Sequence, residues 1–489
     1  MPMSTNKPTL VWFRDDLRVG DNPALHHAVQ SGQPIIAVYI LDEQSDGLRK
    51  MGGAQKWFLH HALESLSSKL KELGATLQVH KGAANFVIQQ IVKEESACSV
   101  HWNRRYGKAE IEIDSALKTW LQEIGVEAHS YLGNLLHEPY KMKTGSGGPY
   151  RVYSPFWRAL EAKGEPRAAH PAPKAIIAHN PSASYKDTGL SDLGLLPNRP
   201  NWASGWNEIW QASEDGAHEA LHRFLEDGLS DYSVGRDFPA KKHFSRLSPF
   251  FRFGMISPYQ VWHALRAVEA TQQLNPKDCL KFLKEVAWRE FSYHLLFHFP
   301  DLGWKNHQPK FDDFPWRTDA AADLTKWQKG QTGYPIVDAG MRELWQTGFM
   351  HNRVRMVVGS FLVKHLLIDW RKGESWFWDT LVDGDPANNT ASWQWIAGCG
   401  ADAAPYFRVF NPMLQGTKFD PGGEYVRKFV PELAALPDKY LNSPWETPSN
   451  VLKQCGITLG ETYPHPIVEH AGARDRALAA FKDLKKAEE

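Results

Sequence analysis

Short runs of apolar residues alternate with amphipathic stretches over the first 130 or so residues of the chain. The runs occupy residues 10–13, 35–41, 75–79, 98–102 and 126–131. Between them, apolar residues recur at the three- and four-residue spacing of a helix, as over residues 59–73 and 113–124. Strands and helices that alternate in this way favour a parallel sheet with helices on both faces. We therefore predict an N-terminal doubly wound parallel α/β domain over residues 1–135.

The pattern changes after this region. Residues 136–205 include a segment rich in Pro, Ala, Ser and Asn, which predicts a long linker. From residue 206 the strand pattern gives way to helical stripes, for example at Val354, Val358, Phe361 and Leu362. We predict an all-helical C-terminal domain over residues 206–489, so that the fold class is α/β plus all-α. Loops rich in Trp, Gly, Asn and Pro are expected at 306–316, 383–395 and 410–423.

Charge and cysteine content limit the class of protein. The 56 Lys and Arg residues balance 56 Asp and Glu residues, which excludes a protein that binds nucleic acid by being basic all over and leaves a local basic face open. The four cysteines lie far apart, so neither a disulfide framework nor a zinc or iron–sulfur motif is supported. Residues 1–9 contain no apolar signal segment, and no run of 18 apolar residues occurs. We expect a soluble cytoplasmic monomer with no membrane contact and no obligate protein partner.

The first candidate site is the segment Ser245-Arg246-Leu247-Ser248-Pro249. Ser248 as N-cap and Pro249 at the first helical position predict the start of a helix. Hydroxyls and a guanidinium at such a start suit a phosphate, but on these five residues alone a plain helix cap is the favoured interpretation. No G-x-G-x-x-G motif follows the first apolar run, so the sheet is not expected to bind a pyrophosphate in the usual dinucleotide manner.

The second candidate site is denser. Asn352, Arg355 and Met356 lie three to four residues apart on a predicted helix, and Asp383 and Asp385 follow about thirty residues later. A structural ion pair would explain Arg355 and Asp383. It would not explain a second carboxylate within a loop rich in Gly, Asn and Trp.

Six motifs occur in the chain in a characteristic order. They are V-W-F-R-D-D-L-R at 11–18, W-R-E-F at 288–291, T-G-Y-P-I-V-D at 332–338, M-H-N-R at 350–353, D-G-D-x-A-x-N at 383–389 and P-Y-F-R-V-F-N-P at 405–412. In these motifs the chain closely resembles the photolyase/cryptochrome family, over residues 9–433. Within that family it is similar to bacterial cyclobutane pyrimidine dimer photolyases. The resemblance implies an α/β domain that binds an antenna pigment, a long linker and a helical domain that binds FAD and DNA.

The resemblance also implies a FAD site. Its residues are Tyr232, Ser245, Arg246, Leu247, Ser248, Arg289, Arg355, Asp383, Asp385 and Asn389. Asn389 matches the residue that faces flavin N5. The reduced flavin is an anion, and a carboxylate about 4 Å away would oppose it by about 4 kcal/mol at an effective dielectric near 20, which a neutral amide avoids. Plant cryptochromes typically have Asp and animal ones Cys at this position, so Asn389 favours a repair enzyme. Phe244 stands where close relatives often have Thr.

For the substrate, the resemblance implies two groups of residues. Glu285, Trp288, Asn352, Met356 and Trp395 match the lesion pocket, and Arg236, Arg353 and Arg408 match residues that hold the DNA backbone. Photolyases take the damaged bases out of the stack, and two indoles suit such a pocket. Relatives that repair (6-4) photoproducts usually have His where this chain has Met356, and a thioether cannot act as a general acid.

Three tryptophans, Trp393, Trp370 and Trp316, match the electron-transfer chain of the family. Glu110 aligns with a glutamate that contacts methenyltetrahydrofolate in some relatives, while a deazaflavin antenna or an empty pocket stays open. No metal is implied.

Taken together, the resemblance implies a deoxyribodipyrimidine photo-lyase that repairs cyclobutane pyrimidine dimers in DNA by electron transfer from excited FADH⁻ to a flipped dimer. The alternatives are a cryptochrome-type photoreceptor, a (6-4) photolyase and a flavin-free DNA-binding protein. Asn389, Met356 and the end of the chain soon after the helical domain, with no long regulatory tail, weigh against the photoreceptor. Met356 and the lack of cysteines for a cluster weigh against the (6-4) enzyme. A protein without flavin would leave Arg355, Asp383 and Asp385 unexplained.

Overall fold

The computed structural model describes residues 7–180, 187–271, 273–403 and 407–486. The start of the motif at 405–412, Pro405 and Tyr406, lies outside the described residues. The chain divides into two compact units. The first comprises Met1–Tyr150, Ser154–Glu226 and Ser245–Pro300, and the second comprises Arg151–Tyr153, Asp227–Phe244 and Asp301–Glu489.

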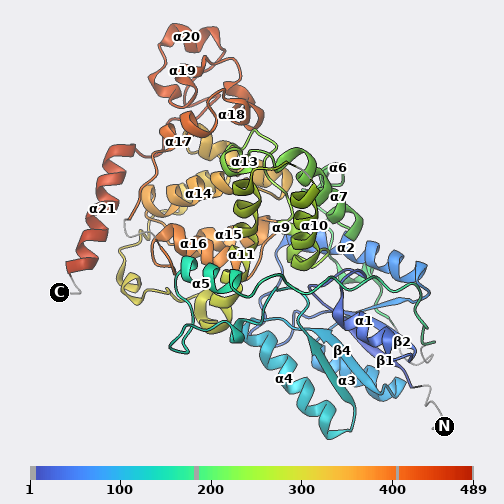
Figure 1. Ribbon diagram of the computed structural model, residues 1–489. Coiled ribbons are helices and arrows are strands. Elements are labelled where there is room, and N and C mark those ends of the chain that lie inside the picture. Colours follow the sequence, from blue (N-terminus) through green and yellow to red (C-terminus); the bar gives the residue numbers. More distant parts are fainter. Residues whose placement is uncertain (1–6, 181–186, 272, 404–406, 487–489) are drawn as a thin grey trace. The chain divides into compact units, whose positions relative to one another are not determined.

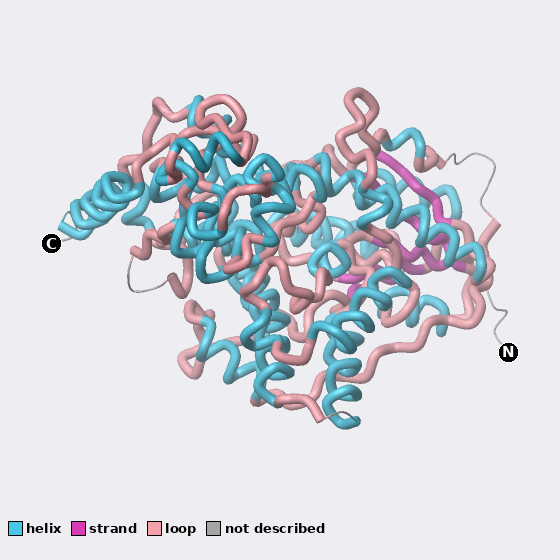
Figure 2. Tube along the Cα trace, turned by 90° about the horizontal axis from the view of Figure 1, so that it is seen from above, coloured by secondary structure: helices cyan, strands magenta, loops and turns pink. Residues whose placement is uncertain are grey.

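A five-stranded parallel sheet forms the centre of the first unit, in the order β3-β2-β1-β4-β5. Figure 1 labels β1, β2 and β4 of this sheet, and Figure 2 colours the strands magenta. Its strands are β1 (Thr9–Phe13), β2 (Ile35–Leu41), β3 (Leu77–Lys81), β4 (Ser99–Asn103) and β5 (Glu127–Tyr131). The register places Thr9 opposite both Ile35 and Ser99. Each predicted run therefore coincides with a strand or is displaced from it by at most two residues, and the predicted doubly wound parallel sheet is confirmed.

Helices cover the sheet, so that β1, β2 and β4 are buried along their whole length. Helix α1 (Pro23–Gln30) packs on β1, β4 and β5, and α2 (Gly53–Glu72) packs on β3. Helices α3 (Ala84–Glu95) and α4 (Lys108–Glu123) pack together over a core that includes Trp12, Val38 and Val100. The strand order reverses after β3, so right-handed crossovers place α3 and α4 on the face opposite α1 and α2.

The remaining helices of the first unit follow the sheet in the chain. They are α5 (Tyr153–Glu161), α6 (Trp206–Ile209), α7 (Glu214–Arg223), α9 (Ser248–Arg252), α10 (Pro258–Thr271) and α11 (Pro276–His298). The predicted N-cap at Ser248 is wrong by one residue. The backbone carbonyl of Leu247 accepts a hydrogen bond from the N–H of Phe251 at 2.9 Å, so Leu247 is the N-cap and α9 begins at Ser248.

The second unit is helical, and none of its described residues lies in one of the five strands. Its helices are α8 (Tyr232–Gly235), α12 (Ala321–Gln328), α13 (Pro335–Thr347), α14 (Asn352–Ser360), α15 (Trp370–Thr380), α16 (Asn388–Ala397), α17 (Pro412–Phe419), α18 (Glu424–Phe429), α19 (Asp438–Leu441), α20 (Ser449–Gln454) and α21 (His470–Lys486). Among the described helices of the whole chain, none is both long and apolar enough to cross a membrane.

Two of the predicted loops contain helices. Asp385 accepts hydrogen bonds from the backbone N–H groups of Ala387 and Asn388 at 2.9 and 2.7 Å, which lets α16 begin at Asn388. Asn411 caps α17 in the same way by accepting from Leu414 at 3.1 Å. The prediction of loops over all of 383–395 and 410–423 is therefore wrong, because the Asp and Asn residues taken as loop formers are helix caps.

The helical stripe predicted over residues 354–366 is not one regular helix. Helix α14 ends at Ser360 and passes directly into a π-helix, η6 (Phe361–His365). The backbone N–H of Leu366 donates to the carbonyl of Phe361 at 3.1 Å, five residues back. The wider turn places Lys364 and His365 inside the unit, where both are buried. Such π-turns occur often at functional sites.

Candidate functional site

The carboxyl ends of β1 and β4 meet where the strand order reverses, which is the usual ligand edge of an open α/β sheet. A polar network fills this edge in the first unit. Arg14 lies 2.7 Å from Asp114, and the Asn103 amide donates to Asp16 at 2.5 Å. All four side chains are buried, and burial raises the pKa of Asp16. The chain's own side chains therefore occupy the space in which such sheets often bind a planar ring.

Glu110 lies in the first turn of α4, close to this edge. Its carboxylate folds back over Gly107, where any larger residue would collide with it. Burial lowers the pKa of Arg105, but the carboxylates of Asp15 and Glu110 outweigh it, so that this pKa is raised. Glu110 is thus partly exposed and electrostatically coupled to a partly buried arginine.

The predicted FAD residues of the first unit lie before α9 and within α11. Arg246 adopts a left-handed backbone with φ of 53°, and its guanidinium lies 5.5 Å from the ring centre of Trp210. The Ser245 hydroxyl accepts from the backbone N–H of Leu247 at 3.4 Å. Arg289 is buried in α11 and donates to the carbonyl of Asn134 at 2.6 Å. Residues 245–247 therefore lie in irregular backbone that leads into the short helix α9, which begins at Ser248.

Two predicted lesion residues, Glu285 and Trp288, lie one turn apart on α11 and share a face of the helix. Lys281, one turn earlier, approaches the Glu285 carboxylate to 3.3 Å. Trp288 packs edge-on against Phe291, with ring centres 5.8 Å apart. Both side chains are partly exposed, so a carboxylate and an indole are presented together at the surface of this unit.

In the second unit, an ion pair joins α14 to the segment before α16. The Arg355 guanidinium donates to the Asp383 carboxylate at 2.8 Å, and its Nε donates to the backbone carbonyl of Met350 at 2.7 Å. Only 3% of the Asp383 side chain is exposed, against 25% of that of Arg355. Asp383 and Asp385 are both buried. The structure thus pairs Arg355 with Asp383, whereas Asp385 accepts hydrogen bonds at the start of α16.

Asn389 lies in the first turn of α16 and is 9% exposed. Its side-chain amide donates to the backbone carbonyl of Glu374 at 3.0 Å and to the Glu374 carboxylate at 2.8 Å. Thr390 donates to the same carboxylate at 3.4 Å. Sequence reasoning missed Glu374, because no motif marks it and its role arises only from the packing of α15 against α16.

Phe244, where relatives often have a hydroxyl, belongs to an aromatic group in the second unit. Its ring stacks on Phe349 with centres 6.3 Å apart and meets His351 edge-on at 5.3 Å. Burial lowers the pKa of His351 to about 4, and its Nδ1 accepts from the backbone N–H of Arg353 at 3.2 Å. Tyr232 is also buried, under the guanidinium of Arg236 at 5.4 Å.

Two of the predicted DNA-binding arginines lie in one neighbourhood. Arg353 pairs with Asp237 at 2.6 Å and lies 4.5 Å from the ring centre of Phe419. Arg236 and Arg353 both act electrostatically on His351. Lys418 lies 5.0 Å from the same Phe419 ring. Cations and aromatic rings therefore cluster here, and Asp237 balances the charge of Arg353. Sequence reasoning also missed Asp237.

The remaining lesion residues lie on α14 and α16. Asn352 is exposed at the first position of α14, and Met356 follows one turn later. The Trp395 indole donates to the backbone carbonyl of Asp402 at 3.1 Å. Asp402 also lines a cavity of about 410 Å³, together with Arg151 and residues 307–310 and 400–401. Trp395 thus lies beside a concave surface that carries basic groups.

The three predicted electron-transfer tryptophans share one hydrophobic cluster. Trp370 and Trp393 are buried, whereas Trp316 is partly exposed. The Trp370 indole donates to Asn306 at 2.9 Å. Trp393 packs against Phe377 with ring centres 4.9 Å apart. The structure therefore places all three indoles in the same core and brings one of them towards solvent.

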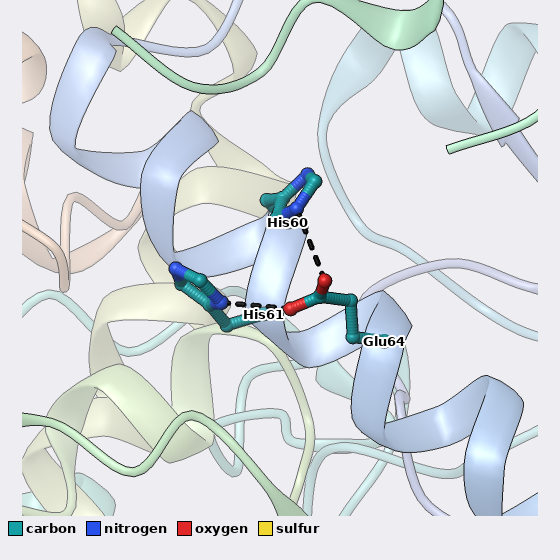
Figure 3. A group of neighbouring side chains, drawn as sticks. All are labelled: His60, His61 and Glu64. Carbon is teal, nitrogen blue, oxygen red and sulfur yellow. Dashed lines mark hydrogen bonds and ion pairs between the residues drawn. The ribbon is translucent and has the colours of Figure 1, made fainter. Parts of the chain in front are cut away.

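One further group of polar side chains lies on α2 in the first unit. The Glu64 carboxylate is 2.8 Å from His61 and 3.4 Å from His60 (Figure 3). Over half of the Glu64 side chain is exposed, and the Nδ1 of His60 is buried with no hydrogen-bond partner among the described residues. Imidazoles that bind metals usually donate their second nitrogen to an acceptor. Ordinary contacts along a helix therefore account for this group, and we assign no metal to it.

Comparison with known proteins identifies relatives along the whole chain. A family model described as DNA photolyase matches residues 9–175, and one described as the FAD binding domain of DNA photolyase matches residues 282–483. A deoxyribodipyrimidine photo-lyase of Agrobacterium fabrum is 53% identical, covering 98% of both chains. Cryptochrome-2 of Arabidopsis thaliana is 34% identical, covering 99% of this chain and 80% of its own.

Solved structures of a photolyase and of a cryptochrome are also similar to this chain. A bacterial class III photolyase from Agrobacterium tumefaciens has a TM-score of 0.94 and 52% identity, covering 99% of this chain and 100% of its own. A cryptochrome from Synechocystis has a TM-score of 0.88 and 31% identity, covering 97% and 99%.

Proposed function

Because the chain belongs to the photolyase/cryptochrome family, we propose that it is a deoxyribodipyrimidine photo-lyase that uses light to repair cyclobutane pyrimidine dimers in DNA. The observation that carries this proposal is the full-length similarity to a photo-lyase at 53% identity, against 34–35% for the plant cryptochromes. Asn389 and Met356 support the same choice, since a neutral amide and a thioether stand where the alternatives have Asp or Cys and His, respectively.

FAD is the cofactor of this family's helical domain, which matches residues 282–483. When bound in its reduced state, FAD supplies the electron that opens the cyclobutane ring. We propose that Tyr232, Arg355, Asp383, Asp385 and Asn389 hold it in the second unit. The donor set fits an anionic ring, because Asn389 offers a neutral amide and Arg355 would share its charge between the ring and Asp383, so that the ion pair adds no net negative charge. For the first unit, we likewise propose that FAD is contacted by five residues whose hydroxyl, guanidinium and backbone groups suit a phosphate, namely Ser245, Arg246, Leu247, Ser248 and Arg289.

The lesion pocket is proposed from the residues that carry indole, carboxylate and amide groups. In the first unit, the Trp288 indole would stack on a flipped pyrimidine, and the Glu285 carboxylate would accept a hydrogen bond from a base imide N–H. In the second unit, the Trp395 indole would stack likewise, and Asn352 and Met356 would add contacts, with Met356 as a polarizable surface that holds no proton. Such a pocket binds and orients the dimer without acid catalysis, as expected for a ring opened by an electron.

DNA containing pyrimidine dimers is the proposed partner, bound as a monomer through Arg236, Arg353 and Arg408. The chain has no net charge, so that affinity must come from these local cations. Their contacts with phosphates make binding sensitive to salt. Residues 206–489 would thus provide the flavin and DNA contacts, with 136–205 as the linker. We propose the cytoplasm as the location, since all four cysteines are free thiols.

For the antenna, we propose methenyltetrahydrofolate, with Glu110 as a contact within residues 1–135. The filled edge of the sheet supports a folate over a deazaflavin. A planar tricyclic ring at the switch point would have to displace the buried pair of Arg14 and Asp114, which lies where open α/β sheets hold such rings. The Glu110 carboxylate is partly exposed and is not one of these buried side chains, so a folate would reach it without displacing them.

For electron transfer, we propose that Trp393, Trp370 and Trp316 relay electrons from the protein surface to the flavin.

The experiment that tests the function is repair itself. Purified protein is reduced, mixed with DNA containing cyclobutane dimers and illuminated with blue or near-ultraviolet light. Recovery of thymine absorbance under light, with none in the dark, is the expected result. Absence of recovery from flavin-loaded protein would favour the photoreceptor, and recovery only with (6-4) substrates would favour the other repair enzyme. The absorption spectrum of the released pigments identifies the antenna.

A further inference from the structure

Lys364 is a cation in the interior of the second unit. It lies in the π-helix η6, and only 5% of it is exposed. Its ammonium donates to the backbone carbonyl of Arg408 at 2.5 Å and lies 4.6 Å from the ring centre of Phe407. Burial, with a smaller contribution from the charge of Arg408, lowers the pKa of Lys364 to about 7. A buried ammonium held by a carbonyl and a ring is costly, and such residues are retained mostly where they serve a function.

The segment that Lys364 holds is the one that carries Arg408. Two hydrogen bonds tie residues 407–410 to the helices beneath them, namely that from Lys364 and one from the backbone N–H of Phe410 to the Ser360 hydroxyl at 3.3 Å. Phe407 is fixed further by stacking on Phe481 of α21, with ring centres 4.7 Å apart. The Arg408 side chain is exposed. A buried proton site is thus joined through one peptide group to an exposed guanidinium.

The charged groups around Lys364 do not neutralise it. Arg408 is the charged group that shifts its pKa among the described residues. On the same element, burial lowers the pKa of His365 to about 3, so that this ring is neutral. Helix α21, packed against η6, contributes His470 and Arg476, which also disfavour protonation of His365. A negative charge that arrives next to Arg408 would therefore relieve the repulsion between Arg408 and the Lys364 ammonium.

We propose that Lys364 is a positioning residue for DNA, which when protonated holds residues 407–410 so that Arg408 meets a phosphate, and that DNA binding is accompanied by proton uptake at Lys364. The proposal rests on the proposed role of Arg408 in holding the DNA backbone. A phosphate beside Arg408 stabilises the ammonium, and by linkage the ammonium favours the phosphate equally. Affinity for DNA therefore falls as the pH rises through 7, by at most about tenfold for each unit by which DNA raises the pKa.

Proton uptake is measured directly by calorimetry. Dimer-containing DNA is titrated into the flavin-loaded protein in the dark at pH 7.5, in two buffers with different enthalpies of ionisation. The wild-type protein is expected to take up a fraction of a proton that Lys364→Met does not. Equal uptake by both proteins would overturn the proposal. A role confined to folding would leave no buffer-dependent heat.

Affinities for dimer-containing DNA measured between pH 6 and 9 distinguish an effect of the charge at position 364 from an effect of the size of its side chain. Lys364→Arg, which stays charged, is expected to bind with the wild-type affinity of pH 6 throughout, and Lys364→Met with that of pH 9. A wild-type slope retained by Lys364→Met would contradict the proposal. If Lys364→Met does not fold, Arg408→Ala serves instead, since it removes the phosphate contact and should remove the uptake.

Failure of this inference and of the proposed function can be told apart. A wild-type protein that neither prefers dimer-containing DNA nor repairs it in light would reject the function. A protein that repairs dimers but shows the same proton uptake with and without Lys364 would reject only the role of that lysine.

Discussion

The side-chain amide of Asn389 donates two hydrogen bonds to one residue, Glu374. Its Nδ2 lies 3.0 Å from the backbone carbonyl oxygen of Glu374 and 2.8 Å from its carboxylate. Glu374 is 3% exposed, so this carboxylate meets little solvent. The contact fixes the orientation of the amide and turns its oxygen away from Glu374. The Glu374 carboxylate therefore favours a neutral hydrogen-bond donor at position 389, apart from any bound flavin.

Asn389→Asp is expected to destabilise the protein. It would place a second carboxylate about 3 Å from that of Glu374, and removal of the amide donor from a buried carboxylate costs about 1–3 kcal/mol before any repulsion is added. Chemical unfolding at pH 7 measures the loss. The double variant Asn389→Asp with Glu374→Gln restores a donor and should recover most of the stability. If the double variant still fails to retain the reduced flavin anion, the loss reflects the electrostatics of the flavin site and not the fold.

Arg355→Gln is expected to weaken retention of reduced flavin. It removes the positive charge proposed to face the anionic ring and leaves Asp383, which is buried, without its ion-pair partner. Breaking a buried pair by removing one partner costs about 3–5 kcal/mol, and partial exposure of Arg355 reduces this figure. Asp383→Asn is the matched variant, since it relieves the unpaired charge. Equal flavin retention by wild type and Arg355→Gln, measured by reductive titration, would show that Arg355 does not serve the ring.

The sequence predicted the sheet well because β1, β2 and β4 are apolar along their length. It placed β3 two residues early, since Gln78, His80 and Lys81 interrupt the apolar pattern of that strand. Motifs located Arg355 and Asp383, which are 28 residues apart and form the expected pair. They could not locate Glu374 or Asp237, because these carboxylates meet their partners only through the packing of segments that are far apart in the sequence. Nothing in the spacing of the chain reports such a contact.

Acid is expected to destabilise the first unit between pH 6.5 and 4. Burial lowers the pKa of His101 to about 4, so its folded-state value lies below the ordinary 6.5. The unfolded chain then binds more protons in this window, and the stability present above pH 6.5 is lost as the pH falls towards 4. For one such histidine the effect is about 1–3 kcal/mol. His101→Gln should flatten the pH dependence of thermal unfolding, whereas replacement of the exposed His222 should not.

Tyr463→Phe is expected to lower the stability of the second unit. The Tyr463 hydroxyl donates to Asp338 at 2.7 Å, and both residues are fully buried. Burial already raises the pKa of Asp338, and the hydroxyl is one of the groups that oppose this. Its loss should cost about 1–3 kcal/mol in urea unfolding at pH 7. Tyr440→Phe, at a partly buried tyrosine, is the control. A loss no larger than that of the control would mean that Thr332 and Gly333 satisfy the carboxylate on their own.

Lys364→Met is expected to stabilise the protein, most strongly below pH 7. The folded-state pKa of Lys364 is about 7, against 10.5 ordinarily, so between these values the unfolded chain binds more protons and wild-type stability rises with pH. Below pH 7 the ammonium is buried at its full cost, which methionine of similar length avoids. The gain should be a few kcal/mol at pH 6.5, at about 1.4 kcal/mol for each pKa unit, and should shrink by pH 9.5. Replacement of the exposed Lys326 by Met controls for composition. A gain that does not change with pH would show that the benefit comes from packing alone, whereas a gain that falls with pH, together with weaker binding of DNA, would show that this lysine trades stability for function.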